Sequence, residues 1–70
     1  MKFRFNEKVI IKNGFYRGFG GRIIRFEEVK IKMPQDLFNK SQFFYDVKIV
    51  FEDHVQIERV NENDLRASLF

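Results

Sequence analysis

Cysteine is absent from this chain of 70 residues, and histidine occurs once, at position 54. Without cysteine the chain can form no disulfide framework, and it offers no thiolate for a metal or for nucleophilic catalysis. A single histidine is also too few for a histidine-based zinc site. The sequence therefore predicts neither a metal site nor a cofactor.

Long apolar runs are absent as well. No stretch approaches the roughly 20 apolar residues that cross a bilayer. The start, Met1–Glu7, also lacks the basic segment and apolar run of a signal peptide. We therefore expect a soluble, cytoplasmic protein with no membrane partner.

Aromatic and charged residues are plentiful. Ten phenylalanines and two tyrosines accompany 33% charged residues, a composition that favours folding over disorder. The length allows one core, so residues 1–70 are predicted to form a single domain, which we expect to be monomeric. The net charge of +3 is unevenly spread, with nine Lys and Arg against three Glu in residues 1–35 and four against seven acidic residues in 36–70. This split suggests an anionic partner for one side of the molecule, although a solvated charged surface gives the same pattern.

Apolar residues recur at every second position, which is typical of β-strands, and nowhere at sustained helical spacing. The chain is therefore predicted to be all-β, with strands at 8–12, 21–33, 45–52, 55–58 and 65–67. We expect a tight turn at Asn13–Gly14, a long hairpin loop at Pro34–Gln42, a two-residue hairpin joint at Asp53–His54 and a polar or 3₁₀ turn at 61–64. The predicted core consists of Phe5, Val9, Ile11, Ile23, Phe26, Val47, Ile49, Val55, Ile57 and Leu65.

Five short strands leave two vulnerable sheet edges unless the sheet curls onto itself, so we expect closure into a small barrel. The twin glycines Gly20–Gly21 stand at the entry to the second strand. They suit a bulge or a close backbone crossing, because a residue without Cβ tolerates either.

Segment 7–23 contains an apolar alternation, then a glycine-aromatic loop, then a glycine two residues before an apolar strand position. In this order it resembles the KOW motif of the small SH3-like barrels found in bacterial transcription-elongation factors and several ribosomal proteins. Gly14, Phe19, Gly21 and Ile23 match the motif position by position. Segment 55–65 also resembles the family's last hairpin, polar turn and closing strand. The resemblance implies a five-stranded antiparallel SH3-like barrel that serves the transcription or translation apparatus.

The loop between the first two strands holds Phe15, Tyr16, Arg17 and Phe19, too many rings for all of them to enter so small a core. At least one ring should be exposed, where it could stack on an unpaired base or anchor a partner protein. The structural alternative is that Phe19 and one neighbour plug the end of the barrel.

Basic side chains project from the first two strands and their loop, and several should share one side, where they could contact phosphates. The alternative is a solvated strand face on which lysine guards against edge pairing, above all at Lys30 and Lys32. The candidate residues for binding nucleic acid or a partner are Lys12, Phe15, Tyr16, Arg17, Phe19, Arg22, Arg25, Lys30 and Lys32.

No catalytic set is recognisable. His54 has Asp53 beside it but no second histidine and no nearby serine, so we expect it to be exposed and inert. Carboxylates cluster on the last hairpin, and paired carboxylates can serve acid-base chemistry or bind Mg²⁺. A small barrel filled by its own side chains has no cleft for such chemistry. The preferred interpretation is therefore an acidic face. The glycines lack the Gly-Lys-Ser/Thr and following helix of a phosphate-binding loop. The sequence therefore predicts a protein that is not an enzyme.

The leading hypothesis is a binding module for nucleic acid, RNA or DNA, or for a nucleoprotein complex, which uses the glycine-aromatic loop and the basic N-terminal half. The alternative is a protein-protein interaction adaptor, or a small accessory subunit of a larger complex, that uses the same loop. A third possibility is an aromatic cage for methylated lysine or arginine, drawn from Phe15, Tyr16, Phe43, Phe44 and Tyr45.

Overall fold

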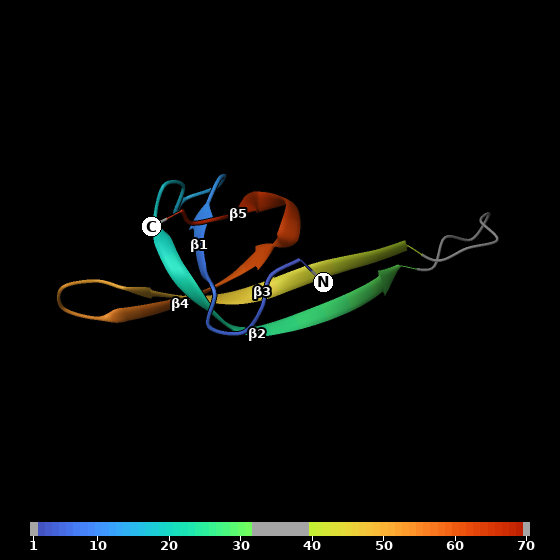
Figure 1. Ribbon diagram of the computed structural model, residues 1–70, viewed down its shortest axis with the longest axis horizontal. Helices are drawn as coiled ribbons and strands as arrows, with labels where there is room; N and C mark the ends of the chain where they lie inside the picture. The colour runs from blue at the N-terminus through green and yellow to red at the C-terminus, as the bar shows by residue number, and fades with distance from the viewer. Residues whose placement is uncertain (1, 32–39, 70) are drawn as a thin grey trace.

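The computed structural model describes residues 2–31 and 40–69, which form one antiparallel sheet (Figure 1). Its strands are β1 (Lys8–Ile11), β2 (Gly20–Ile31), β3 (Lys40–Val50), β4 (Val55–Asn61) and β5 (Leu65–Ala67), with the 3₁₀ turn η1 (Glu62–Asp64) between β4 and β5. The predicted all-β class and the five antiparallel strands are confirmed. The strand order is β4-β3-β2-β1-β5, so the last strand returns to pair with the first.

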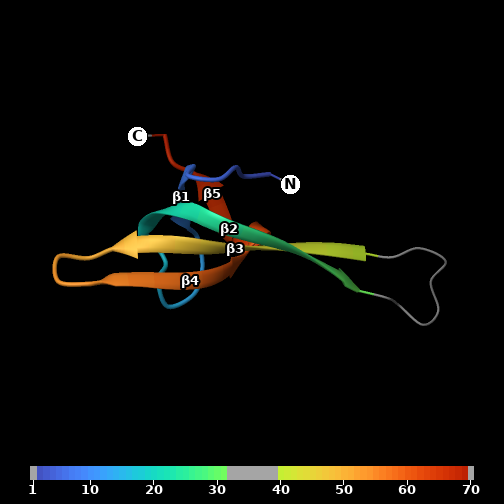
Figure 2. The same cartoon turned by 90° about the horizontal axis from the view of Figure 1, so that it is seen from below.

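The sheet curls so that β1 and β5 lie across from β3 and close over the core (Figures 1 and 2). The two edge strands, β4 and β5, are not neighbours in the hydrogen-bonded order, so the curled sheet stays open along this seam, where the sequence predicts closure. The reason is local: η1 turns the chain away from β4, and β5 is only three residues long and pairs with β1. The buried core is made by Phe3, Val9, Ile11, Ile23, Tyr45, Val47, Ile49 and Leu65.

Two predicted core residues on β4 are wrong, and the hairpin turn explains why. The backbone N–H of Phe51 donates to the carbonyl of His54 (2.8 Å), so the two-residue turn is Glu52–Asp53 and not Asp53–His54. Any two-residue turn, at Asp53–His54 as predicted or at Glu52–Asp53 as observed, pairs odd residues of β3 with even residues of β4, as in Val47 with Glu58, and the predicted core did not take this parity into account. Because side chains alternate between faces, Val55 and Ile57 point away from the core and are about half exposed.

The predicted core residues Phe5 and Phe26 are also exposed, at 76% and 48%. Phe5 lies in the turn before β1, and Phe3 enters the core in its place. Phe26 pairs with Tyr45 after a β-bulge between Ile23 and Arg25, at the end of the core where fewer strands cover it. The structure therefore corrects the predicted core at four positions and adds Phe3 and Tyr45.

Tyr45 ties the N-terminal segment to the sheet. Its hydroxyl oxygen accepts from the backbone N–H groups of Lys2 (3.1 Å) and Phe3 (3.2 Å), and the hydroxyl donates to Glu62 Oε2 (2.6 Å). Burial, together with the hydrogen bond to Glu62, raises the pKa of Tyr45. The folded state therefore holds the phenol proton to higher pH than the unfolded chain does.

The raised pKa of Tyr45 predicts a loss of stability in alkali. Above the ordinary tyrosine pKa of about 10, the unfolded chain releases its proton while the folded protein retains it, so the free energy of unfolding falls as pH rises toward the folded pKa. Urea titrations at several pH values should show this decline, and Tyr45→Phe should flatten it. A decline of equal steepness in the variant would contradict the assignment to Tyr45.

β2 and β3 extend beyond the body of the sheet as a two-stranded ribbon (Figure 2). Register pairs run from Glu28 with Phe43 to Ile31 with Lys40, past the last β3–β4 pair, Phe44 with Asn61. The ribbon contributes to the elongated shape, 48 × 21 × 18 Å. Lys40, Ser41 and Gln42 are thus strand residues and not part of the predicted loop, whose remaining residues, 34–39, lie outside the described residues.

Candidate functional site

The β1–β2 loop is held by its own backbone. The N–H of Ile11 donates to the Phe19 carbonyl (2.9 Å), and the N–H of Gly18 donates to the Ile11 carbonyl (2.8 Å). The N–H of Arg17 donates to the Gly14 carbonyl (3.1 Å). Gly14 and Gly18 have φ of +98° and +92°, a region that glycine adopts readily. The left-handed backbone predicted at Gly14 is present, but the hydrogen-bonded turns lie at Gly14–Arg17 and Tyr16–Phe19 and not at Asn13–Gly14. These bonds give the loop an ordered frame.

The loop rings form one cluster with the end of the β3–β4 hairpin. Phe15 and Phe19 each meet Tyr16 edge-on, with centroids 5.0 and 5.9 Å apart. Phe51 lies 5.3 Å from Phe19 and stacks on His54, with centroids 4.7 Å apart and ring planes 14° from parallel. We call Phe15, Tyr16, Phe19, Phe51 and His54 the aromatic platform.

The platform is partly embedded and partly open. Tyr16 and Phe51 pack against the core, whereas Phe15 is 91% exposed and Phe19 43% exposed. The exposed loop ring expected from the sequence is therefore present, and Phe19 is partly covered by Tyr16 and Phe51 while still facing solvent. His54 is exposed, as expected, but its ring extends the platform.

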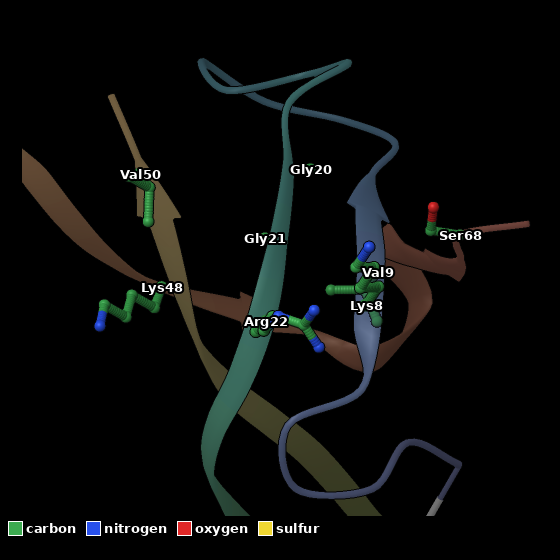
Figure 3. A pocket seen from close by; sticks show the side chains of 8 residues that line it. All are labelled: Lys8, Val9, Gly20, Gly21, Arg22, Lys48, Val50 and Ser68. Carbon is green, nitrogen blue, oxygen red and sulfur yellow. The ribbon is translucent and has the colours of Figure 1, made fainter. Parts of the chain in front are cut away.

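A groove of about 540 Å³ lies across β1, β2 and β3 (Figure 3). Gly20 and Gly21 of β2 lie between Val50 on β3 and Lys8 with Val9 on β1, and Arg22 extends from β2 toward β1. The complete lining is Lys8, Val9, Gly20, Gly21, Arg22, Lys48, Val50 and Ser68. Phe19 and Phe51 continue the core-facing positions of β2 and β3, whereas Gly20 and Val50 point to the opposite face, so the groove and the platform lie on different sides of the sheet.

Three cations of the groove stand in one cross-strand line. Lys8 pairs with Arg22 and Arg22 with Lys48, on three adjacent strands. We call these residues the cationic row. Like charges that face each other directly across strands destabilise a sheet, and among the described residues no acidic side chain lines the groove. Within the described residues none of the three forms an ion pair, so the row lacks a balancing anion.

The next line of charges on the same face is balanced. Asp46 pairs with Arg25 on one side and with Arg59 on the other. Arg59 also forms an ion pair with Glu27 and lies over the Phe44 ring, 4.7 Å from its centroid. Arg59 lowers the pKa of the Glu27 carboxyl through its hydrogen bond and its charge. Among the described residues the cationic row thus differs from its surroundings in having no carboxylate partner; Arg22 Nη1 instead donates a hydrogen bond to the Asn6 carbonyl oxygen (2.9 Å).

The structure brings together only part of the predicted site. Phe15, Tyr16 and Phe19 join the platform with Arg17 in the same loop, and Arg22 lies in the groove. Lys12 is exposed just after β1, where its N–H bonds to the Asp64 carbonyl (2.7 Å).

Two predicted candidates lie farther along the molecule. Arg25 faces Asp46, and Lys30 faces Ser41 in the ribbon. Eight residues of strand, about 26 Å at 3.3 Å per residue, separate Lys30 from Arg22. Lys32 lies outside the described residues. Lys30 and Arg25 therefore do not belong to the groove.

Sequence reasoning missed Lys8, Lys48, Phe51 and His54 as site residues. Lys8 alternates with the core residue Val9, and Lys48 with Val47 and Ile49, so both were identifiable as outward-facing. Their alignment with Arg22 depends on strand register, which the alternation alone does not give. Of the five rings named for a possible cage, Tyr45 is completely buried and cannot contribute.

The described residues contain no group of three or more His, Asp or Glu placed to hold a metal ion. Within this same part of the chain, no helix is long and apolar enough to cross a membrane. Comparisons with protein-family models, with curated proteins and with solved structures gave no match to this chain.

Proposed function

We propose that this chain is a non-enzymatic, cytoplasmic binding module for nucleic acid, acting alone or within the transcription or translation apparatus. The observation that carries the proposal is the cationic row: three cations on adjacent strands, in a groove lined by no carboxylate. A polyanion that enters the groove would remove the repulsion between these side chains. The β4–η1–β5 order supports membership of the KOW-type SH3-like family as part of the same proposal.

The groove suits a sugar-phosphate backbone. Lysine and arginine contact phosphates without reading base identity, so binding should show little sequence preference. Gly20 lowers the floor of the groove because it carries no side chain, which lets the ligand backbone approach β2 closely.

Replacing one groove cation should weaken binding and reduce its salt dependence. Each phosphate contact with a single strand contributes about 0.7 to the negative log-log slope, so three contacts give a slope near −2 and Arg22→Gln should reduce it by about 0.7. Fluorescence anisotropy with labelled RNA and DNA at several salt concentrations measures both quantities.

The matched control is Lys40→Gln, which makes the same change in net charge at the ribbon, opposite Ile31. It should leave the salt slope close to that of the wild type. Equal effects of the two variants would show that only net charge matters and would reject the groove. Absence of binding below about 100 μM at low salt, the weak end of ordinary non-specific affinity, would reject nucleic acid as the ligand.

The adaptor function is a second candidate because one apolar patch borders the groove. Val50 pairs with Val55, and these side chains are 70% and 50% exposed; Ile57 is 54% exposed beside Lys48. Exposed apolar groups next to one another are typical of protein contact surfaces. A partner held there would resist nuclease and be insensitive to salt, which distinguishes it from a nucleic-acid ligand.

A further inference from the structure

We propose that a second hollow, on the core side of the sheet, binds an arginine side chain of a partner protein. The hollow has a volume of about 210 Å³ and lies between the β1–β2 loop, β4 and η1. Phe15, Tyr16, Glu58 and Asp64 are among the residues that line it, and we call it the acidic hollow. The inference goes beyond the proposed function, because it concerns another side of the molecule and another class of ligand.

Strand register separates the acidic hollow from the cationic row. Glu58 pairs with the core residue Val47, and Val60 packs against the core, so both side chains lie on the core side of β4. The residue between them and the turn, Ile57, pairs with Lys48 of the cationic row on the opposite side. The two surfaces therefore can hold different ligands at the same time.

The carboxylates of the hollow have no cationic partner among the described residues. Glu58 Oε1 accepts a hydrogen bond from Gln56 Nε2 (3.3 Å), and Asp64 Oδ1 accepts one from Asn13 Nδ2 (3.0 Å). Both donors are neutral amides. Two negative charges thus line the hollow without a positive charge to balance them, which favours binding of a cation.

Arg59 does not supply the missing charge, although it also lines the hollow. Its guanidinium forms an ion pair with Glu27 and lies over the Phe44 ring, 4.7 Å from the centroid. These contacts are on the opposite side of the sheet, where Arg59 pairs with Asp46. The balancing cation therefore has to come from a ligand.

The rings beside the carboxylates favour a flat cation. Phe15 is 91% exposed and meets Tyr16 edge-on, with centroids 5.0 Å apart, so most of the Phe15 ring is open to a ligand. A guanidinium group stacks on aromatic rings and donates several N–H bonds to carboxylates at the same time. The ammonium group of lysine is a strongly hydrated point charge and lacks this planar shape. The combination of ring and carboxylate therefore points to arginine.

The size and the rigidity of the hollow suit one side chain. Its volume is below the roughly 300 to 1,000 Å³ of a site for a whole small molecule. The Lys12 N–H donates to the Asp64 carbonyl (2.7 Å), and the Asn13 side chain donates to the Asp64 carboxylate, so the loop is anchored to η1. Because both walls are fixed before the ligand arrives, little conformational freedom is lost on binding.

The test is a nuclear magnetic resonance titration of the isotopically labelled protein with three capped pentapeptides. They carry arginine, lysine or citrulline at the centre, flanked by glycine and serine. The arginine peptide should shift the amide signals of Phe15, Tyr16, Glu58 and Asp64 at up to about 10 mM, the concentration range for a millimolar affinity. The lysine peptide should bind more weakly. The citrulline peptide, which keeps the shape of arginine without its charge, should cause no shift.

Two variants and their matched controls locate the site. Phe15→Ala should weaken binding of the arginine peptide by about 2- to 30-fold, the range for one cation–π contact. Glu58→Gln should weaken it by about 5-fold, the upper value for an ion pair that water reaches. The controls are Phe5→Ala, which removes a 76% exposed phenyl group, and Glu52→Gln, which removes a charge from the β3–β4 turn. Both positions are outside the hollow, and these variants should bind the peptide as the wild type does.

Several results would overturn the inference. Absence of shifts with the arginine peptide, or equal shifts with the citrulline peptide, would reject a cation site. Equal affinity for the lysine peptide would reject the assignment to arginine. Equal shifts with magnesium ions would show that the carboxylates attract any cation without help from the rings. Circular dichroism spectra matching the wild type confirm that each variant is folded.

A last comparison separates the acidic hollow from the proposed function. Arg22→Gln, and saturation of the wild type with an oligonucleotide, should leave the affinity for the arginine peptide unchanged. Displacement of the peptide by the oligonucleotide would contradict the placement of the two sites on opposite sides. If the arginine peptide binds while no nucleic acid does, the proposed function is rejected and the acidic hollow stands.

Discussion

Gly21→Ala should largely unfold the protein. A Cβ built at Gly21 would lie 2.6 Å from the Lys48 carbonyl oxygen and 2.6 Å from Val47 Cγ1. The carbonyl belongs to the β3 backbone, so it cannot move away without disturbing the β2–β3 pairing. We expect a loss of about 3 kcal/mol in the free energy of unfolding. This is comparable to the roughly 3 to 5 kcal/mol that a core of this size supplies.

Gly20→Ala provides the matched control at the next position. Its Cβ would meet the Ile10 side-chain end, Cδ1, at 3.3 Å and the Val9 carbonyl oxygen at 3.5 Å. The methyl end can rotate aside, so the variant should lie within about 1 kcal/mol of the wild type. Urea titrations followed by circular dichroism measure both changes. Equal stability of the two variants would contradict the close approach of β2 to β3 at Gly21.

The glycine pair illustrates what sequence predicts well. A close backbone crossing is expected at Gly20–Gly21 because glycine tolerates what other residues do not. The structure assigns the crossing to Gly21 alone, while Gly20 faces the groove. The absence of a side chain in glycine predicts the position of the close crossing to within one residue. The pairing of β2 with β3 decides which of the two glycines is required there.

The fourth strand illustrates what sequence predicts poorly. The bounds of β5, the apolar alternation of β4 and the two-residue turn are all visible in the sequence. An even number of turn residues places Val55 and Ile57 on the face away from the core, but the predicted core followed the apolar character of these residues and not this parity. The turn Glu52–Asp53 turns both side chains outward, where they join Val50 beside the groove. The error in the predicted core thus reveals the apolar patch that borders the candidate site.

The cationic row required information that no single strand contains. Lys8, Arg22 and Lys48 are 14 and 26 residues apart in the chain, and only the pairings β1–β2 and β2–β3 align them. The charge asymmetry between the two halves of the sequence points to the first half, yet Lys48 comes from the second. Residues from both halves of the sequence therefore share one face of the molecule. Strand pairing, and not position in the sequence, decides which charges become neighbours.

Tyr45→Phe should destabilise the protein although the ring stays in place. The Tyr45 hydroxyl uses its full hydrogen-bonding capacity, with two backbone donors and the Glu62 carboxylate as acceptor. Removing it leaves the buried N–H of Phe3 without an acceptor, at an expected loss of about 1 to 3 kcal/mol. Amide exchange at Phe3 should accelerate at the same time, because this contact holds the N-terminal segment against the sheet.

The other tyrosine supplies the control for this prediction. Tyr16 packs its ring against the core, and among the described residues its hydroxyl has no hydrogen-bond partner. Tyr16→Phe makes the identical chemical change and should alter the free energy of unfolding by no more than about 0.5 kcal/mol. Urea titrations and amide exchange on both variants decide the matter. If Tyr45→Phe were as stable as Tyr16→Phe and Phe3 stayed protected, packing of the Phe3 ring on Tyr45, 5.4 Å between centroids, would hold the N-terminal segment without the hydroxyl.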